Sequence, residues 1–200
     1  MTGLRPEQRL IADWIGEGAR VLDLGCGDGA LLAALRHTKG VTGYGIEIDP
    51  DNLIACIARG VNVIHSNLDA GLSEFDADSF DYVIMTQTIQ ALRFPHHLIG
   101  DILRIGREGI VTFPNMGHWK CRLALLRGRM PVTRHLPHTW YDTPNIHMCT
   151  IGDFDALCAT NDIEVLERAS VDSEHRTTAG MRLLPNLLAE IAVYRLRQRR

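Results

Sequence analysis

Residues 21–29, VLDLGCGDG, determine the predicted fold of this 200-residue chain. An aliphatic run stands directly before three glycines, Gly25, Gly27 and Gly29, which alternate with other residues. The aliphatic run predicts a buried strand, and ALLAALRHT at 30–38 predicts the helix that follows. Glycine has no Cβ atom, so it tolerates left-handed backbone and lets a ligand approach the main chain closely. The stretch therefore predicts a strand, a ligand-binding turn and a helix.

The alternation of short aliphatic runs with helical patterns continues along the whole chain. It predicts an α/β fold in which a mostly parallel sheet is covered by helices on both faces. Thr150, with Asp153 three residues later, predicts the capped start of a helix. The last run, 191–197, alternates apolar and polar residues, which predicts a half-exposed edge strand with antiparallel pairing. Seven strands are expected, at 19–24, 41–48, 61–66, 79–87, 108–114, 162–170 and 189–198, and helices at 30–38, 50–60, 95–105 and 150–161.

The length and composition are those of a globular protein. We expect one domain over residues 1–200, with an insert at about 114–150 after the fifth strand. The chain is 46% hydrophobic and 22% charged, with a net charge of −3, which argues against nucleic acid as a partner. No apolar run is long enough to span a bilayer, and the first residues lack the apolar core of a signal peptide. These features predict a cytoplasmic protein that does not bind membranes.

The spacing of cysteine and histidine predicts neither a disulfide framework nor a metal site. The five cysteines are odd in number and no two have CxxC spacing, so we expect reduced thiols. The histidine pairs His96–His97 and His135–His138 lack a second motif that would supply the two further ligands of a zinc ion.

The residue before the glycines indicates which ligand the turn binds. Dinucleotide-binding turns have a G-x-G-x-x-G pattern and receive a pyrophosphate at the helix N-terminus. Here the pattern is G-x-G-x-G, and Asp23 stands two residues before the first glycine. A carboxylate repels phosphate and attracts an ammonium group, which S-adenosylmethionine carries together with a sulfonium. We therefore predict S-adenosyl-L-methionine, or S-adenosyl-L-homocysteine, as the cofactor rather than a nicotinamide dinucleotide.

Residues that follow the next three strands complete the predicted cofactor site. Glu47, at the end of the second strand, is placed to accept hydrogen bonds from the ribose hydroxyls. Asn67 and Leu68 follow the third strand, where the adenine would lie, and Gln87 follows the fourth. Each piece alone is also compatible with a turn, a helix cap or a surface charge, but their order after successive strands makes the combination specific. The predicted cofactor-binding residues are Asp23, Gly25, Cys26, Gly27, Asp28, Gly29, Glu47, Ile48, Asn67, Leu68 and Gln87.

Longer stretches of the chain resemble the methionine-biosynthesis MetW family. The resemblance runs from about residue 8 to the last strand and implies the Rossmann-like fold of class I S-adenosylmethionine-dependent methyltransferases. It also implies a role in methionine biosynthesis together with homoserine O-acyltransferase, the enzyme that activates homoserine. Where the family usually has an acidic residue after the third strand, this chain has Asn67. The stretches are YGIEIDPDN (44–52), GVNVIHSNLDAGL (60–72), FDYVIMTQTIQAL (80–92), FPNMGHWKCRLALLRGRMPVT (113–133) and WYDTPNIHMCTIGDF (140–154).

The insert has an unusual charge pattern and allows two interpretations. From residue 109 to residue 141 there is no acidic residue, yet there are five lysines and arginines and three histidines. Trp119, Leu123 and Leu126 have helical spacing, so one interpretation is an amphipathic helix that packs on the sheet and leaves its charges solvated. The other is a surface for an anionic partner or substrate. The candidate substrate or partner residues are His118, Trp119, Arg122, Arg129, Tyr141 and His147.

The sequence leaves two functions open and identifies no catalytic residue. In the first, the protein binds the cofactor and serves a homoserine O-acyltransferase as an auxiliary or regulatory subunit. In the second, it is an active methyltransferase that acts on a small substrate with a carboxylate. His118 and His147 are equally suited to anchor the insert by hydrogen bonds as to act in catalysis. Whether the chain forms a homodimer stays open.

Overall fold

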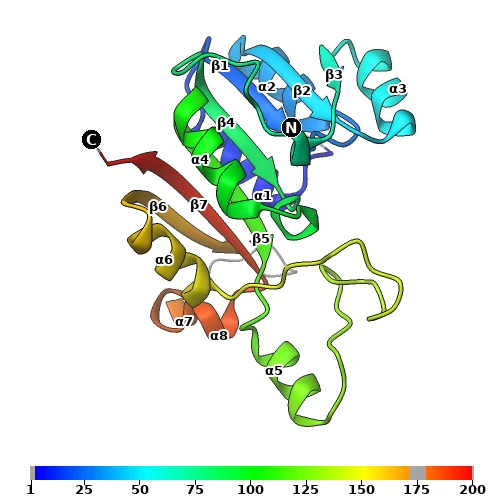
Figure 1. The fold of residues 1–200 in the computed structure, drawn as a ribbon, viewed down its shortest axis with the longest axis vertical. Helices are drawn as coiled ribbons and strands as arrows, with labels where there is room; N and C mark the ends of the chain where they lie inside the picture. Colours follow the sequence, from blue (N-terminus) through cyan, green and yellow to red (C-terminus); the bar gives the residue numbers. More distant parts are fainter. Residues whose placement is uncertain (1–2, 172–178, 200) are drawn as a thin grey trace.

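Seven strands form one sheet in the order β3-β2-β1-β4-β5-β7-β6 (Figure 1). The computed structural model describes residues 3–171 and 179–199, whereas the predicted domain also includes the residues outside these ranges. β1 pairs in parallel with β2 and β4, and β7 pairs antiparallel with β5 and β6. The predicted seven-stranded architecture is confirmed. The strands are β1 (Arg20–Leu24), β2 (Thr42–Glu47), β3 (Val63–His65), β4 (Phe80–Thr86), β5 (Gly106–Pro114), β6 (Ile163–Val171) and β7 (Ile191–Gln198).

The expectation that the last strand lies at an edge of the sheet is wrong. β7 lies between β5 and β6, and most of its residues are buried. Its two arginines pair with acids of the neighbouring strands, Arg195 partly buried and Arg197 exposed. Arg195 pairs with Glu108 of β5 at 2.6 Å, and Arg197 pairs with Glu164 of β6 at 2.8 Å. The alternation of apolar and polar residues therefore reflects ion pairs across the strands.

Helices cover both faces of the sheet, and each face has its own apolar core. α1 and α2 pack on one face, where Ile11 and Leu35 join Ile84 of β4. α4 and α6 pack on the other face, where Ile102 and Phe154 join the inward residues of β4 and β5. The helices are α1 (Pro6–Trp14), α2 (Ala30–Lys39), α3 (Pro50–Ala58), α4 (Pro95–Ile105), α5 (Trp119–Leu126), α6 (Ile151–Thr160), α7 (Ala179–Leu183) and α8 (Pro185–Leu188), with 3₁₀ turns η1 (Leu68–Ala70) and η2 (Ile89–Ala91).

Local sequence signals account for the predicted helices. Thr150 Oγ1 accepts a hydrogen bond from the amide of Asp153, whose carboxylate accepts one from the Thr150 amide, so α6 begins with the expected capping box. α1, α7 and α8 were not predicted. None of the helices in the described part of the chain is long and apolar enough to cross a membrane.

The insert leaves the sheet after β5 and returns at α6. It contains α5, and residues 127–150 form no regular helix or strand. Its two ends meet at the buried side chain of Asn115, whose Oδ1 accepts hydrogen bonds from the amides of Gly117 and Ile151. The Nδ2 group of Asn115 donates to the carbonyl oxygens of Asn186 and Ala189. One side chain thus joins the start of the insert, the start of α6 and the end of α8.

Candidate functional site

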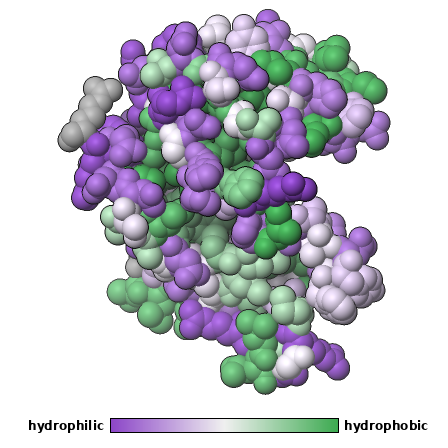
Figure 2. Space-filling model, in the orientation of Figure 1, coloured by the Kyte–Doolittle hydropathy of each residue, from purple (hydrophilic) through white to green (hydrophobic). Residues whose placement is uncertain are grey.

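The predicted cofactor residues gather where the strand order reverses, between β1 and β4. In open α/β sheets, ligands bind beyond the carboxyl ends of the strands at such a reversal. β1, β2 and β4 are parallel, so their carboxyl ends lie at one edge of the sheet. Figure 2 shows the molecule hollowed between the part that carries β2, β3 and α3 and the part that carries the insert. This edge is therefore the candidate binding site.

The glycine turn after β1 has the left-handed backbone that its sequence predicts. Gly25, Gly27 and Gly29 have φ angles of 69°, 55° and 73°. A Cβ atom on Gly25 would lie 2.5 Å from Oγ1 of Thr88, so this glycine allows a close approach to the end of β4. A Cβ atom on Gly27 would meet no atom within 4 Å. The Gly27 main chain therefore faces open space that a ligand can occupy.

Asp23 is a buried carboxyl group without a complete set of partners. Its side chain is 1% exposed, and Oδ1 has no hydrogen-bond partner among the described residues. Burial raises the pKa of Asp23 from 3.8 to about 7, with a smaller opposing effect of Arg5 and a further rise from Glu47. A buried polar atom without a partner is costly, and a cationic ligand group would satisfy it. Asp23 thus fits the ammonium end of the predicted cofactor.

Glu47 lies beside the glycine turn and holds it in place. Its Oε2 accepts a hydrogen bond from the Gly27 amide at 2.8 Å, and Oε1 accepts from the amides of Ile48 and Asp49. A carboxylate has about four acceptor positions, so three of them are used by the main chain. Ile48, the next residue, is 54% exposed and available for contact with a flat apolar group. The ribose contact of Glu47 stays a prediction.

Four other predicted residues have side chains engaged elsewhere. The thiol of Cys26 lies 3.7 Å from the Cys56 thiol in the core, and Asp28 pairs with Arg59 at 2.9 Å. Leu68 is buried in the apolar core. Asn67 is exposed and caps η1 by accepting a hydrogen bond from the amide of Asp69. At Cys26 and Asp28, a cofactor would be contacted through the main chain rather than the side chain.

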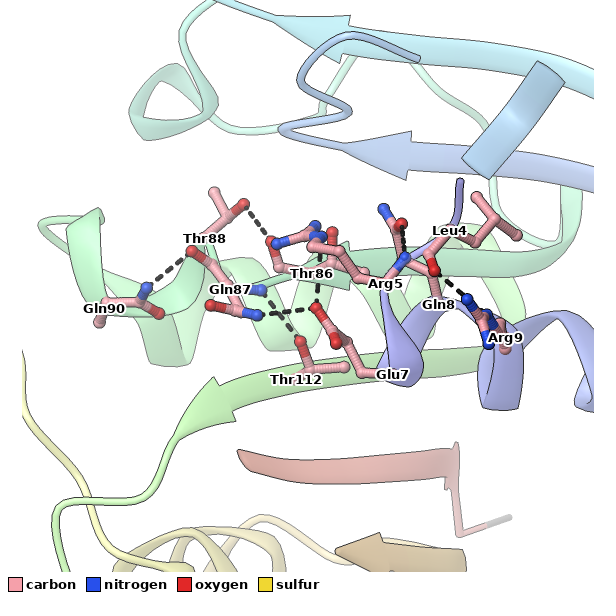
Figure 3. Close-up of polar contacts among 10 residues, drawn as sticks. All are labelled: Leu4, Arg5, Glu7, Gln8, Arg9, Thr86, Gln87, Thr88, Gln90 and Thr112. Carbon is pink, nitrogen blue, oxygen red and sulfur yellow. Dashed lines mark hydrogen bonds and ion pairs between the residues drawn. The ribbon is translucent and has the colours of Figure 1, made fainter. Parts of the chain in front are cut away.

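Gln87 is connected to two residues that the sequence did not reveal, Arg5 and Glu7 of the amino-terminal segment (Figure 3). Gln87 has a left-handed φ of 50°, and its Nε2 donates to Oε1 of Glu7 at 2.8 Å. Glu7 is 2% exposed and also pairs with Arg5 at 3.3 Å. Non-glycine residues with such backbone persist where surrounding contacts enforce them, often at functional sites. The proline of RPEQR, at the first position of α1, is the sequence signal that would have predicted this helix.

The candidate substrate and partner residues of the insert do not form one cluster. His118 is buried and caps α5, with Nδ1 accepting from the Lys120 amide, and burial lowers its pKa. His147 is exposed, and its Nε2 lies 3.2 Å from the carbonyl oxygen of Arg93. Arg122 donates to the carbonyl oxygen of Gly117. Arg129 and Tyr141 are exposed. The two histidines thus make contacts that hold the insert.

The interpretation of α5 as a helix whose apolar stripe packs on the sheet is wrong. Trp119 is 44% exposed and Leu126 is 85% exposed, whereas Cys121 is the buried residue of the helix. Residues 127–150 do not cover these side chains and expose several apolar groups of their own. The exposed large apolar residues of the insert are Trp119, Leu125, Leu126, Met130, Val132, Trp140, Tyr141, Ile146 and Met148.

Metal ligation has no candidate in the part of the chain that the structure describes. No group of three or more His, Cys, Asp or Glu side chains in residues 3–171 and 179–199 is arranged to hold a metal ion.

Comparison with known proteins identifies a family and a relative that each match most of the chain. The family described as Methionine biosynthesis protein MetW matches residues 5–196. A Rhodopirellula baltica protein, the bifunctional methionine biosynthesis protein MetXA/MetW, is 34% identical over 200 residues that cover 95% of this chain and 32% of that protein. The chain thus spans about a third of the length of this relative.

Solved structures share the fold at low sequence identity. An S-adenosylmethionine-dependent methyltransferase from Mesorhizobium loti superimposes with a TM-score of 0.71 at 16% identity, over 97% of this chain and 98% of that one. A Haloferax volcanii methyltransferase structure, solved in a complex with the Trm112 activator, gives 0.69 at 19% identity over 97% and 90% of the two chains. The predicted class I methyltransferase fold is confirmed.

Proposed function

Because this chain belongs to the MetW family of methionine biosynthesis proteins, we propose that it is a cofactor-binding auxiliary subunit of a homoserine O-acyltransferase. The cofactor would be S-adenosylmethionine or S-adenosylhomocysteine, held at the edge formed by β1, β2 and β4. The relative from Rhodopirellula baltica, named MetXA/MetW, supports the association, since we take MetXA to be the acyltransferase. Fusion keeps two parts of a chain at high effective concentration. Separate chains reach the same proximity by forming a complex.

The residues of the candidate site fit this cofactor. Asp23 offers a buried carboxylate oxygen to an ammonium group, and Gly27 leaves open space beside the main chain. Ile48 offers an exposed apolar side chain next to Glu47. When bound, S-adenosylmethionine supplies an electrophilic methyl group on a sulfonium. The residues around it bind and orient the molecule in either of the two candidate functions.

The exposed apolar surface of the insert is the observation that carries the proposal. We define the insert face as Trp119, Leu125, Leu126, Met130, Trp140 and Tyr141, which are between 44% and 85% exposed. Exposed large apolar groups flanked by charged residues are typical of protein interfaces, where tryptophan, tyrosine and arginine are enriched. Arg127, Arg129 and Arg134 are exposed on the insert, whereas its acidic neighbours are Asp142, next to Tyr141, and Glu190, which pairs with Lys120. The excess of positive charge suits an acidic partner surface. An isologous dimer through this face would instead bring like charges together.

Substitution of the insert face is expected to abolish binding of the acyltransferase. In Leu126→Ser/Trp140→Ser, two of the most exposed apolar side chains of the face are removed, which we expect to weaken binding by about a hundredfold. Both side chains are exposed, so the free energy of unfolding should change little. The measurement is affinity capture of the tagged variant with the acyltransferase of the same organism, followed by the acylation rate with and without it.

A matched control uses apolar residues that are equally exposed but distant in the fold. Ile54 and Ile57 on α3 are 67% and 68% exposed, and Ile54→Ser/Ile57→Ser should bind the acyltransferase like the wild type. Equal capture of the insert variant and this control would contradict the docking face. No capture of the wild type and no effect on acylation would contradict the auxiliary function itself.

The alternative function is methyl transfer to a small acceptor with a carboxylate. The intact glycine turn and the open space at Gly27 favour it, because a methyltransferase needs the same cofactor site. Consumption of S-adenosylmethionine with a pathway metabolite, in the absence of the acyltransferase, would support this function over the auxiliary one.

We also propose that the protein acts in the cytoplasm. All five cysteines are free thiols in the structure, including Cys26 and Cys56, whose sulfur atoms are 3.7 Å apart. Free thiols at this separation are typical of a reducing compartment.

A further inference from the structure

A cavity of about 350 Å³ lies under the insert, apart from the residues assigned to the cofactor. It is formed by the end of β5, α5, the loop 131–136 and Glu190, the residue before β7. About half of its lining residues are apolar, among them Ala124, Pro131 and Leu136, and the others are polar or charged. Small-molecule sites combine apolar surface with polar groups that converge on the ligand, and the many charged groups here favour a polar, charged ligand.

Glu190 is the acidic centre of the cavity. Its side chain is 14% exposed, and its two carboxylate oxygens have different partners. Oε1 lies 3.1 Å from Nζ of Lys120, and Oε2 lies 3.4 Å from Nε2 of His135. Lys120 is 52% exposed, so its ammonium group is free to move toward a ligand without leaving solvent. The carboxylate of Glu190 is thus held in the cavity, whereas the ammonium group of Lys120 can change position when a ligand binds.

His135 provides a second polar group with unused hydrogen-bonding capacity. Its Nε2 is shielded from solvent and has no hydrogen-bond partner in the described part of the chain, because its approach to Glu190 lacks suitable geometry. Burial lowers the pKa of His135 and that of His118, which also lines the cavity, so both rings favour the neutral form. The fixed charges that remain are one carboxylate, on Glu190, and the cations of Lys120 and Arg134.

The carboxylate of Glu190 lies beside the exposed ammonium group of Lys120, with apolar surface next to both. This arrangement matches a molecule that carries a positive and a negative charge at one end and a side chain at the other. We propose that this cavity binds a small α-amino acid, with its ammonium group at Glu190 and its carboxylate at Lys120. The binding itself is independent of the proposed function, but its role rests on that function. An amino acid of the pathway would then bind directly beside the insert face. Lys120 immediately follows Trp119 of that face, and its Nζ lies 5.8 Å from the centre of the Trp119 ring. Occupation of the cavity would therefore alter the surface offered to the acyltransferase.

The test is calorimetric titration of the isolated protein with L-methionine and with L-homoserine. The protein is first saturated with S-adenosylhomocysteine, since the amino-acid end of the cofactor could otherwise offer a second site at Asp23. We expect one-to-one binding of at least one of the two amino acids. The methyl ester of the amino acid that binds lacks the carboxylate charge and should bind at least about tenfold more weakly.

Variants assign the binding to the cavity. Glu190→Gln and Lys120→Met should each weaken binding by about tenfold or more, since each removes one charge-assisted contact. Glu164→Gln is the matched control, because Glu164 also pairs with a cation but lies on β6. The melting temperature and the S-adenosylhomocysteine affinity of Glu190→Gln should stay at the wild-type values, which shows that the variant is folded.

No binding of either amino acid, or equal binding by wild type and Glu190→Gln, would overturn the inference. Binding that disappears when S-adenosylhomocysteine is present would also overturn it, because the amino acid would then lie in the cofactor site. None of these results affects capture of the acyltransferase, so the proposed function is tested separately.

Discussion

The Asp23→Asn variant is expected to be more stable than the wild type at pH 8 and to lose most of its affinity for S-adenosylhomocysteine. In the unfolded chain the carboxyl ionises near its ordinary pKa of 3.8, whereas burial raises the pKa in the folded protein to about 7. The folded state therefore holds a proton that the unfolded state has lost, so the free energy of unfolding falls as the pH rises from about 4 to 7. Each pKa unit corresponds to about 1.4 kcal/mol, which sets the penalty at roughly 4 kcal/mol or less.

The pH dependence separates this effect from a change in packing. Asparagine has nearly the same shape but cannot ionise, so its stabilising effect should be present at pH 8 and vanish near pH 4. Urea unfolding at both pH values measures it. A variant that is less stable than the wild type at both pH values would show that Asp23 is not a buried ionising group.

Binding of the cofactor should have the opposite dependence on pH in the wild type. A cationic ammonium group favours the ionised form of Asp23, so binding should release a proton and become tighter from pH 6 to pH 8. Calorimetry in two buffers of different ionisation enthalpy measures the released proton. In Asp23→Asn both the proton release and the pH dependence should be absent. If they persist, the ammonium group of the cofactor binds at another residue.

The Gly27→Ala variant is expected to fold and to fail to bind S-adenosylhomocysteine. A Cβ atom at Gly27 would meet no protein atom within 4 Å. The free energy of unfolding should therefore fall only by the strain of an alanine with left-handed backbone, about 1–2 kcal/mol. The same Cβ atom would stand in the open space that the proposed cofactor fills. We expect at least a hundredfold loss of affinity, measured as loss of the ligand-induced rise in melting temperature.

Gly60→Ala is the matched control for this prediction. Gly60 follows α3, has a φ of 71°, and a Cβ atom there would also meet nothing within 4 Å. The two variants should therefore have similar melting temperatures without ligand, and only Gly27→Ala should lose the shift. An unchanged ligand shift in Gly27→Ala would mean that the cofactor does not approach the glycine turn.

The parts of the fold that sequence predicts best are those that local chemistry determines. The turn at 25–29 needs left-handed backbone, and glycine is the residue that adopts it without strain. Thr150 and Asp153 lie within one turn of a helix, so the cap of α6 is likewise a local property. Asp23 and Glu47 lie in the last two positions of the adjacent parallel strands β1 and β2, which brings both carboxylates to one edge of the sheet.

The parts that the sequence did not predict depend on contacts between distant residues. The alternating pattern of β7 is the same whether the strand lies at the edge or inside the sheet, and only its pairing with both β5 and β6 distinguishes the two. The contact of Gln87 with Glu7 joins residues 80 positions apart. The exposure of Leu126 follows from the path of residues 127–150, which have no periodic pattern to predict it.

The side chain of Asn115 fixes both ends of the insert at one point of the fold. It bonds to Gly117 at the start of the insert and to Ile151 at its end, and it ties both to α8. The insert is therefore a loop whose two ends are held together at a neck formed by Asn115. A change in the length of such a loop costs little entropy. Beyond this neck, the insert is also held to the segment after β4, where the amides of Ile146 and His147 donate to the carbonyl oxygen of Gln90. A change in the exposed stretch between these two attachments would therefore alter the surface of the insert without a change in the sheet.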